Sequence, residues 1–402
     1  MLIERLVLRQ FRNYKETSVA FAPGGAYISG PNGSGKTNLL EAIYYLANHA
    51  SFRTQRREEL QTWNAAHSVI EARVMRRETQ QQSELAVQLT PQGRRLLFNG
   101  KETKDVRRFT AHIAAVVFHP GTINVIKGGP AGRRYLLDRG IYSLQPEFGQ
   151  LSQQFQRALK QRNALLRNTT QHASSNLGVW TDHFIDAAVR LMHYRQAYVE
   201  RLNIALAGLS QELGDDVGRV SLEYRPAIFA KLAAYEDRAA GWEDDMRLQA
   251  QCRAEAQRLQ RAEEAVGQTL FGPQRDDCVI RFRGRESRGY ASQGEQRLAA
   301  FLLVAALSLE IYRQRGHYPV ILLDDVISEL DERHRRVIFD FLKAYHFQVF
   351  ITDAEDRPRY RELSALTPLR VRQMGGWADI GSVETASDGS DDPRPPSPPR
   401  GE

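Results

Sequence analysis

The chain has 402 residues, a formal net charge of +7, 42% hydrophobic residues and 26% charged residues, the composition of an ordinary globular protein with room for two or three domains. No apolar run approaches the roughly 18 residues that a membrane-spanning helix needs. Because the segment Met1–Arg5 also lacks the features of a signal peptide, we expect a cytoplasmic protein. The two cysteines, Cys252 and Cys278, lack metal-ligand spacing, which argues against a zinc site or a disulfide framework.

Short alternating segments predict a strand-rich region in residues 1–132. After a first strand at the N-terminus, strands are expected over Thr17–Phe21, Ala26–Ser29, Val69–Arg76, Leu85–Leu89 and Ala114–Phe118. The pair Asn99-Gly100 predicts the turn of a hairpin. The segment Asn38–Leu46 follows a glycine-rich loop and has helical periodicity.

Helical patterns replace strand patterns in residues 133–270, which we expect to form a helical arm domain. Apolar residues recur at helical spacing over Leu151–Leu165 and Trp180–Leu202, and a long charged helix is expected over Trp242–Val266. Such stripes are typical of helix faces that pack into a core, so they do not indicate a cofactor site.

Alternation of strands and helices returns in residues 271–383. Strands are expected over Cys278–Phe282, Val320–Leu323 and Gln348–Ile351, with helices after Ser292 and from Asp331. Residues 384–402 are rich in Pro, Ser, Gly and Asp, cannot offset their ordering entropy by burial, and are expected to form a disordered tail. The predicted fold is therefore α/β, with a core that the helical arm interrupts.

A complete P-loop motif, G-x-x-x-x-G-K-T, lies between a predicted strand and a predicted helix. Its residues are the expected ATP-binding set: Gly30, Pro31, Asn32, Gly33, Ser34, Gly35, Lys36 and Thr37. Its backbone N–H groups and the start of the helix favour phosphate binding. Lys36 is expected to contact the phosphates, and the Thr37 hydroxyl is expected to bind Mg²⁺.

Two adjacent carboxylates end the apolar strand Val320–Leu323. Asp324 is the candidate Mg²⁺ ligand, and Asp325 is the candidate group that polarises the attacking water. Together with Lys36 they form the predicted catalytic set. Acidic strand ends are common, so it is the combination with a P-loop that gives this pattern its meaning.

The segment from Ser292 to Gln296 has two interpretations that can hold together. Ser292 and Glu295 form a capping box for the following helix. The sequence Ser-Gln-Gly-Glu also resembles the signature motif of ABC-type ATPases, in which Ser292 would contact, in trans, the γ-phosphate bound to a second subunit.

The segment Ser328-Glu329-Leu330-Asp331 directly follows the acidic strand. Asp331 is a suitable N-cap for the next helix. The same position resembles the D-loop of ABC-type ATPases, so Ser328 and Asp331 are candidate dimer contacts. The last strand ends in Thr352-Asp353 where many such ATPases have a switch histidine. Sensing of the γ-phosphate is therefore left to one of these two residues or to neither.

These motifs and their neighbours resemble the RecF family over nearly the whole folded chain. The matching segments are Leu8–Tyr14, Gly30–Ile43, Ser51-Phe52-Arg53, Gly272–Asp277, Ser292–Arg297, Leu322–Val326 and Ser328–Asp331. The family's pattern also implies that Arg12 and Asn13 lie near the nucleotide, although an ordinary strand end would give the same residues. Asp325 stands where most relatives of this ATPase class have Glu, which implies slow hydrolysis.

The resemblance implies an SMC-like head that lacks a long coiled coil. It further implies an ATP-dependent homodimer that binds double-stranded or gapped DNA, with weak, DNA-stimulated ATPase activity. The implied partners are RecR, with RecO, in loading RecA at single-stranded gaps. The positive charge suits a polyanionic partner, although arginines on solvated faces would give the same composition. No individual DNA-contacting residue follows from the sequence.

Three other classes fit the sequence less well. A transporter ATPase would have a Leu-Ser-Gly-Gly-Gln-like signature and a switch histidine. A chromosome-structural SMC protein would need hundreds of heptad residues between its two halves. A nuclease fused to such an ATPase would need a further acidic domain, and too few residues follow Ile351 to form one.

Overall fold

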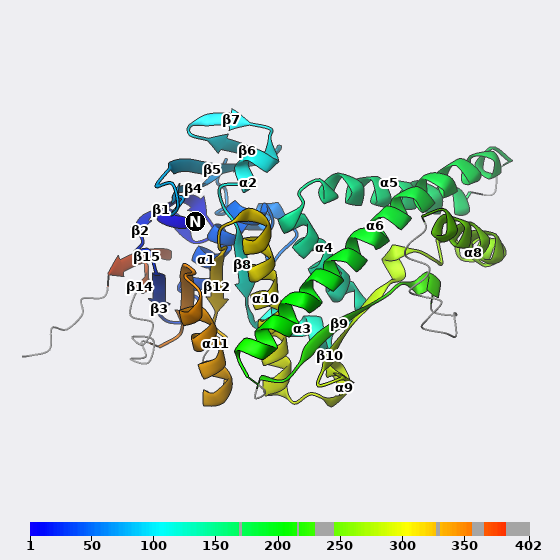
Figure 1. Ribbon diagram of the computed structural model, residues 1–402. Coiled ribbons are helices and arrows are strands. Elements are labelled where there is room, and N and C mark those ends of the chain that lie inside the picture. The colour runs from blue at the N-terminus through cyan, green and yellow to red at the C-terminus, as the bar shows by residue number, and fades with distance from the viewer. Residues whose placement is uncertain (169–170, 215–216, 230–244, 327–329, 356–365, 383–402) are drawn as a thin grey trace, which may run out of the picture.

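The computed structural model of the protein describes residues 1–168, 171–214, 217–229, 245–326, 330–355 and 366–382. Strands from both ends of the chain form one part of the molecule, and helices from the middle form an arm that extends from it (Figure 1). This arrangement confirms the predicted α/β fold with a helical insertion. The tail that we predicted to be disordered, residues 384–402, lies outside the described residues.

The first sheet is antiparallel and comes entirely from the N-terminal region, with the order β2-β1-β4-β5-β6-β7. Its strands are β1 Leu2–Phe11, β2 Tyr14–Ala20, β4 Ser68–Met75, β5 Gln82–Thr90, β6 Gly93–Phe98 and β7 Lys101–Thr103. The predicted hairpin is present between β6 and β7, where Asn99 and Gly100 have φ angles of 49° and 76°. Two consecutive residues with positive φ make the type I′ turn that suits the twist of a hairpin.

The second sheet, with the order β15-β14-β3-β13-β12-β8, combines strands from both ends of the chain. Its strands are β3 Gly25–Ser29, β8 Ala115–Phe118, β12 Val320–Asp324, β13 Val349–Asp353, β14 Thr367–Met374 and β15 Trp377–Ser382. All neighbouring pairs are parallel except β14 and β15. Neither β14 nor β15 was predicted from the sequence.

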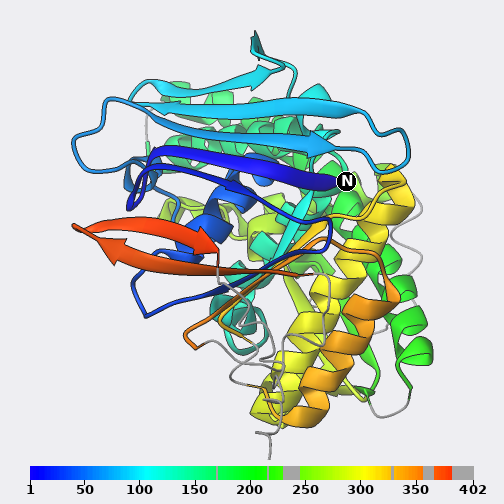
Figure 2. The ribbon, with the colours of Figure 1, turned by 90° about the vertical axis from the view of Figure 1, so that its left-hand side faces the viewer.

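Helix α1, Lys36–Asn48, lies between these two sheets, whereas α10, Gln293–Arg315, and α11, Glu332–Ala344, cover the opposite face of the second sheet (Figure 2). Strand alternation divides the core accordingly. Val320 and Leu322 pack on the α1 side, whereas Ile321 and Leu323 pack on the α10 side. Strands that are buried on both faces read as continuous apolar runs, which is why β12 could be predicted.

The arm consists of α4 Pro130–Leu144, α5 Phe148–Leu166, α6 Gln171–Glu212 and α8 Asp245–Val266. At 1.5 Å per residue, the 42 residues of α6 span about 63 Å. A buried ion pair of 2.6 Å between Arg162 and Glu263 joins α5 to α8. The helix that we predicted over Trp242–Val266 is described only from Asp245, because residues 242–244 lie outside the described part of the chain.

A third, antiparallel sheet, β11-β10-β9, packs against α4 and α6 of the arm. It comprises β9 Val220–Arg225, β10 Asp277–Phe282 and β11 Arg285–Glu286, and β9 was not predicted. The remaining helices are short: α2 Val106–Thr110, α3 Asn124–Lys127 and α9 Ser287–Tyr290, with 3₁₀ turns over Arg57–Leu60, Pro120–Ile123, Ala227–Phe229 and Pro273–Arg275. None of the helices in the described residues has the length and apolar character needed to cross a membrane.

Candidate functional site

The P-loop connects the end of β3 to the start of α1, as the sequence predicted. Gly35 has a φ of 119°, and a Cβ at this position would lie 2.9 Å from the Cβ of Ala378. Gly30 has a φ of 155°, and a Cβ there would lie 2.3 Å from the carbonyl oxygen of Val371. Both positions therefore require glycine, and in both cases the close neighbour belongs to the hairpin β14–β15.

Lys36 is buried, and its ammonium group lies over its own loop. Its Nζ donates to the carbonyl oxygens of Gly30 at 2.7 Å and Pro31 at 3.0 Å. Burial lowers the pKa of Lys36, while Asp325, Asp324 and Asp353 oppose the shift. The cation therefore lies beside both the P-loop and the acidic strand ends, and its loop bonds can be exchanged for bonds to an anion.

Thr37 and Asp324 are in direct contact although they are 287 positions apart in the sequence. The Thr37 hydroxyl donates to Asp324 Oδ1 at 2.8 Å, and the Thr352 hydroxyl donates to the same oxygen at 2.9 Å. Burial raises the pKa of Asp324, and these two hydrogen bonds oppose the shift. Two of the predicted metal ligands thus meet at the edge where β3, β12 and β13 end.

These oxygen atoms fit Mg²⁺, which prefers hard oxygen ligands. Within the described residues, no group of three or more His, Cys, Asp or Glu side chains is placed to hold a metal ion. A cation at Thr37 and Asp324 would therefore complete its shell with phosphate oxygens and water, as Mg²⁺ ordinarily does.

Asp325 and Thr352 are hydrogen-bonded to each other beside the contact between Thr37 and Asp324. Asp325 has a φ of 50°, and its backbone N–H donates to Thr352 Oγ1 at 3.0 Å. A positive φ at an aspartate is uncommon and fixes the direction of its side chain. The buried Thr352, which we considered as a γ-phosphate sensor, accepts from Asp325 and donates to Asp324.

Residues outside the P-loop motif hold the loop in place through hydrogen bonds. Asn13 Nδ2 donates to the carbonyl oxygen of Ser34 at 3.0 Å, and the Tyr14 hydroxyl donates to that of Gly35, also at 3.0 Å. Asn38 Nδ2 donates to Asn13 Oδ1 at 2.8 Å. The proximity of Asn13 to the P-loop therefore follows from specific bonds, and Asn13 is more than an ordinary strand end.

Glu41, whose side chain is fully buried in α1, is the centre of a second set of contacts. Arg12 donates to both of its carboxylate oxygens at 2.8 Å, and the Ser51 hydroxyl also donates to it. Arg53 lies 3.5 Å away and donates to Asn38 at 2.6 Å. The segments with Arg12 and Arg53 are therefore fixed to the P-loop helix.

An open pocket of about 600 Å³ lies beside the P-loop, and sequence reasoning missed most of its walls. Arg12, Asn13, Asn38 and Arg53 form its base, and Trp63 and Trp377 contribute aromatic surface. Trp63 is 93% exposed, an unusual state for so large an apolar side chain. No sequence signal marked either tryptophan, because each lies outside the recognised motifs.

Ser292 caps α10, as one of its two interpretations predicted. Its hydroxyl accepts from the backbone N–H of Glu295 at 3.3 Å, and the Glu295 carboxylate accepts from the backbone N–H of Ser292 at 2.8 Å. Among the described residues, no hydrogen bond or ion pair joins Ser292 to the P-loop of the same chain. The cap is what the structure shows for Ser292, and its contact with a phosphate in trans stays a prediction.

Asp331 caps α11, and it also pairs with a histidine that the sequence analysis did not single out. Its carboxylate accepts from the backbone N–H of His334 at 2.9 Å and lies 2.7 Å from His334 Nδ1. The His334 ring in turn leaves no room for a Cβ at Gly294, which would lie 2.9 Å from the ring. Ser328, the other predicted D-loop residue, lies outside the described residues.

Comparisons with known proteins agree on one family. Residues 2–369 match the family described as the RecF/RecN/SMC N-terminal domain. The DNA replication and repair protein RecF of Acidothermus cellulolyticus is 34% identical over 89% of this chain and 95% of its own length. The protein of the same description from Geobacter sp. strain M21 is 35% identical over 88% of this chain and 93% of its own length.

Solved structures give the same result for the fold. A structure described as the recombination mediator protein RecF with ATP, in the RecFOR pathway, has a TM-score of 0.79 and 25% identity. The match covers 94% of this chain and 97% of that chain. An SMC head bound to the C-terminal winged-helix domain of ScpA has a TM-score of 0.53 at 16% identity, covers 95% and 98% of the two chains, and shows a shared fold alone.

Proposed function

The chain belongs to the RecF family, and from this premise we propose that it is an ATP-dependent recombination mediator that acts on DNA in replication and repair. The observation that carries the proposal is the 2.8 Å contact between Thr37 and Asp324. It joins the P-loop to the acidic strand, so that phosphate-binding and cation-binding groups share one edge of the sheet. The solved relative described with ATP supports the choice of nucleotide.

In this proposal the P-loop, Gly30–Thr37, holds the phosphates, and Lys36 exchanges its bonds with the loop carbonyls for bonds to phosphate oxygens. Thr37 and Asp324 would hold Mg²⁺, which would supply positive charge beside the phosphates. Asp325 orients the attacking water. Its side chain is one methylene shorter than the glutamate of most relatives, so hydrolysis is weak and serves mainly to end the ATP-bound state.

The pocket with Trp63 and Trp377 is proposed to receive the base and ribose of the nucleotide. It opens beside Asn13 and Asn38, which are linked to each other and to the P-loop. An aromatic side chain offers a flat apolar surface on which a purine can stack. Trp63 is exposed in the free protein, as expected for a side chain that the base of the nucleotide would cover on binding.

We further propose that ATP closes two subunits face to face. Ser292 and the start of α10 would then bind the γ-phosphate of the partner's nucleotide, with Ser328 and Asp331 beside them. The cap at Ser292 is made within one chain and lies at an exposed helix start, which leaves the N-terminal dipole available to an anion. Each composite site thus needs residues from both subunits.

The remaining parts of the proposal rest on family membership. The division of the chain into a split head, 1–132 and 271–383, and an arm, 133–270, follows the family's architecture. The dimer is proposed to bind double-stranded or gapped DNA in the cytoplasm, where DNA stimulates its ATPase activity. The proposed protein partners are RecR, with RecO, in loading RecA at single-stranded gaps, and the RecFOR pathway of the solved relative supports this assignment.

The first test is the solution mass of the full-length protein, measured by light scattering with and without ATP·Mg²⁺ and a short gapped duplex. We expect a monomer that becomes a dimer only with ATP and that retains DNA in that state. Lys36→Ala should remain monomeric, since nucleotide binding should weaken by a factor on the order of 100 when the charged phosphate contact is removed.

Two outcomes would contradict the proposal. A mass that nucleotide does not change would limit Ser292 to its capping role. If Lys36→Ala bound ATP weakly and still dimerised fully with it, the shared-site mechanism would be wrong. The melting temperature without nucleotide, which we expect to be similar for both proteins, serves as the control for folding.

A further inference from the structure

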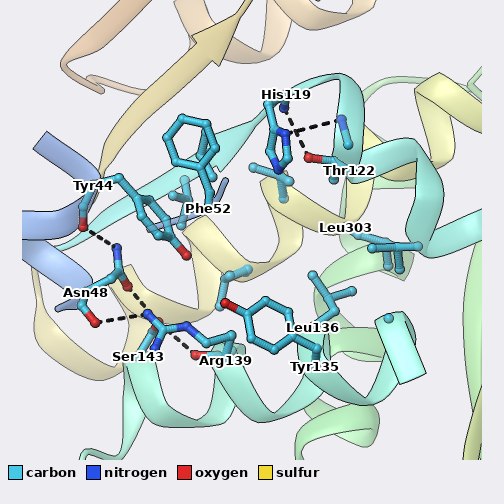
Figure 3. Close-up of a pocket in the computed structure, with 18 of the residues that line it drawn as sticks. Tyr44, Asn48, Phe52, His119, Thr122, Tyr135, Leu136, Arg139, Ser143 and Leu303 are labelled. Carbon is cyan, nitrogen blue, oxygen red and sulfur yellow. Dashed lines mark hydrogen bonds between the residues drawn. The ribbon is translucent and has the colours of Figure 1, made fainter. Parts of the chain in front are cut away.

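A second pocket lies at the junction of the P-loop helix, the second sheet and the arm (Figure 3). Its volume is about 270 Å³, close to the lower end of the range of small-molecule sites. Residues of α1, β8, α4, α6 and α10 line it. Tyr44 and Phe52 lie on one side of the pocket, and Tyr135 and Arg139 lie on the other.

The walls are mainly apolar, and several of their polar groups are already bonded to the protein. Asn48 donates to the carbonyl oxygen of Ala115 at 2.9 Å and accepts from Ser143 at 3.3 Å. His119 Nδ1 accepts from a backbone N–H, and burial together with Arg53 lowers the pKa of His119 to about 4. The imidazole is therefore uncharged near pH 7, and these groups offer little to a second polar ligand.

Arg139 brings a positive charge to the wall of the pocket. Its Nη2 donates to the carbonyl oxygen of Asn48 at 3.0 Å, and its guanidinium group lies 5.3 Å from the centre of the Tyr142 ring. Its Nε, however, is buried and has no hydrogen-bond partner, and among the described residues no carboxylate forms an ion pair with it. Arg139 lines the pocket and is only partly buried, so an anion in the pocket would supply the counter-ion that the protein does not provide.

We infer that this pocket binds a compact organic anion, with an aromatic or alicyclic body of about two rings and one carboxylate or sulfonate group. The body lies among Phe52, Leu136 and Leu303, and the anionic group accepts from Arg139. A dry cavity of about 150 Å³ is enough to hold a single benzene ring, so a larger cavity accommodates a second ring. Charge-assisted hydrogen bonds to guanidinium are short and strong, which selects an anion over a neutral analogue.

The site lies between two parts of the protein. Tyr44 and Asn48 belong to α1, which begins at the P-loop, whereas Arg139 belongs to the arm, so an occupant contacts both parts.

The test uses a matched pair of fluorescent probes with the full-length protein. The anion is 5-(dimethylamino)naphthalene-1-sulfonate, and the uncharged analogue is 1-(dimethylamino)naphthalene, which has the same two fused rings and no sulfonate. We expect one saturable site for the anion and binding at least about tenfold weaker for the neutral probe, because the bond to Arg139 is missing.

Three variants identify the site. Arg139→Gln should weaken binding of the anion about tenfold and leave the neutral probe unchanged. Gly132→Phe should block binding of both probes, since Gly132 lines the pocket within α4 and a Cβ there meets no atom within 4 Å. Arg157→Gln removes an exposed arginine elsewhere in the arm, so it controls for general attraction of the anion and should bind like the wild type.

The proposal fails if the anion shows only non-saturating fluorescence, or if Arg139→Gln binds it as tightly as the wild type does. It fails equally if Gly132→Phe, with a wild-type circular dichroism spectrum and melting temperature, leaves both titrations unchanged. A purely structural role of Arg139 would weaken the binding of both probes alike. Weaker binding of the anion alone in Arg139→Gln therefore identifies a direct contact.

Discussion

The P-loop and the start of α10 are held by different numbers of neighbours. The P-loop contacts β1–β2 through Asn13 and Tyr14, β12 through Asp324 and the hairpin β14–β15 through Ala378. The start of α10 is satisfied by its own Ser292 and Glu295. The P-loop is thus held by contacts from several other parts of the same chain. The start of α10 has its backbone groups satisfied by its own first turn and remains exposed.

In the proposed dimer, one fold would support both a fixed binding surface, at the P-loop, and a shared one, at the start of α10. Electrostatic stabilisation of phosphate is most effective when the donors are already oriented, and the contacts around the P-loop supply that orientation. A surface that meets a second subunit must instead be stable alone and accessible. A capping box meets both conditions, because it stabilises the helix and leaves the dipole exposed.

The largest expected effect concerns Glu41, the buried carboxylate of α1, and tests how much the stability of the protein depends on it. Glu41→Gln removes the anion that pairs with Arg12 and lies beside Arg53, leaving both guanidinium groups with only a neutral acceptor. Breaking a buried pair in this way should lower the free energy of unfolding by about 3 kcal/mol. The measurement is a urea unfolding curve without nucleotide.

Glu84→Gln is the matched control for that change. Glu84 pairs with Arg73 at 3.5 Å, but both side chains are about half exposed, at 55% and 45%. Surface pairs contribute little, so we expect a loss below about 0.5 kcal/mol. Equal losses of unfolding free energy in the two variants would mean that the Glu41 contacts stabilise the protein no more than an exposed ion pair does.

The next-largest expected effect is a loss of stability at low pH that comes from one histidine, His49. His49, at the end of α1, is buried, and neither ring nitrogen has a hydrogen-bond partner. Burial, with Arg94 and Arg139, lowers its pKa from 6.5 to about 3. The unfolded chain therefore binds a proton to His49 at a pH where the folded chain does not, so stability is complete above pH 6.5 and falls as the pH decreases toward 3.

At pH 5 this linkage amounts to about 2 kcal/mol. His49→Asn should lose that part of the pH dependence, because asparagine tolerates the left-handed φ of 54° and does not titrate. The measurement is a series of urea curves between pH 7 and pH 5. His346→Asn, at an exposed position, should retain the wild-type slope, and a wild-type slope in His49→Asn would rule out this explanation.

The sequence was most informative where a local pattern and a buried surface agree. The P-loop, the run Val320–Leu323 and the capping residues Ser292 and Asp331 were predicted because each depends on neighbouring residues. The strand β9 was missed because it is six residues long and lies among helical stripes. The hairpin β14–β15 was missed because no motif marks it, although it lies directly against the P-loop.

Long-range partners explain the rest of the difference. Glu41 reads as an ordinary helix residue until the fold brings Arg12 and Ser51 beside it. Trp63 and Trp377 lie more than 300 positions apart and line one pocket only after the two sheets assemble. Helix and strand periodicity carries no information about such pairs, so a single sequence could not have located the pocket.

The smallest expected effect on stability separates the two roles of Ser292. Ser292→Ala should cost about 1 kcal/mol of unfolding free energy through loss of the cap, whereas Ser292→Asp and Ser292→Asn, which cap equally well, should change it by less than about 0.5 kcal/mol. If the start of α10 binds the partner's γ-phosphate, the aspartate places a negative charge against it, and the ATP-dependent dimer should be lost in Ser292→Asp but retained in Ser292→Asn. Light scattering with ATP·Mg²⁺, beside a urea curve for each variant, distinguishes these outcomes. A fully dimeric Ser292→Asp protein would leave the helix cap as the whole role of this residue, and the contrast between a fixed and a shared surface would not hold.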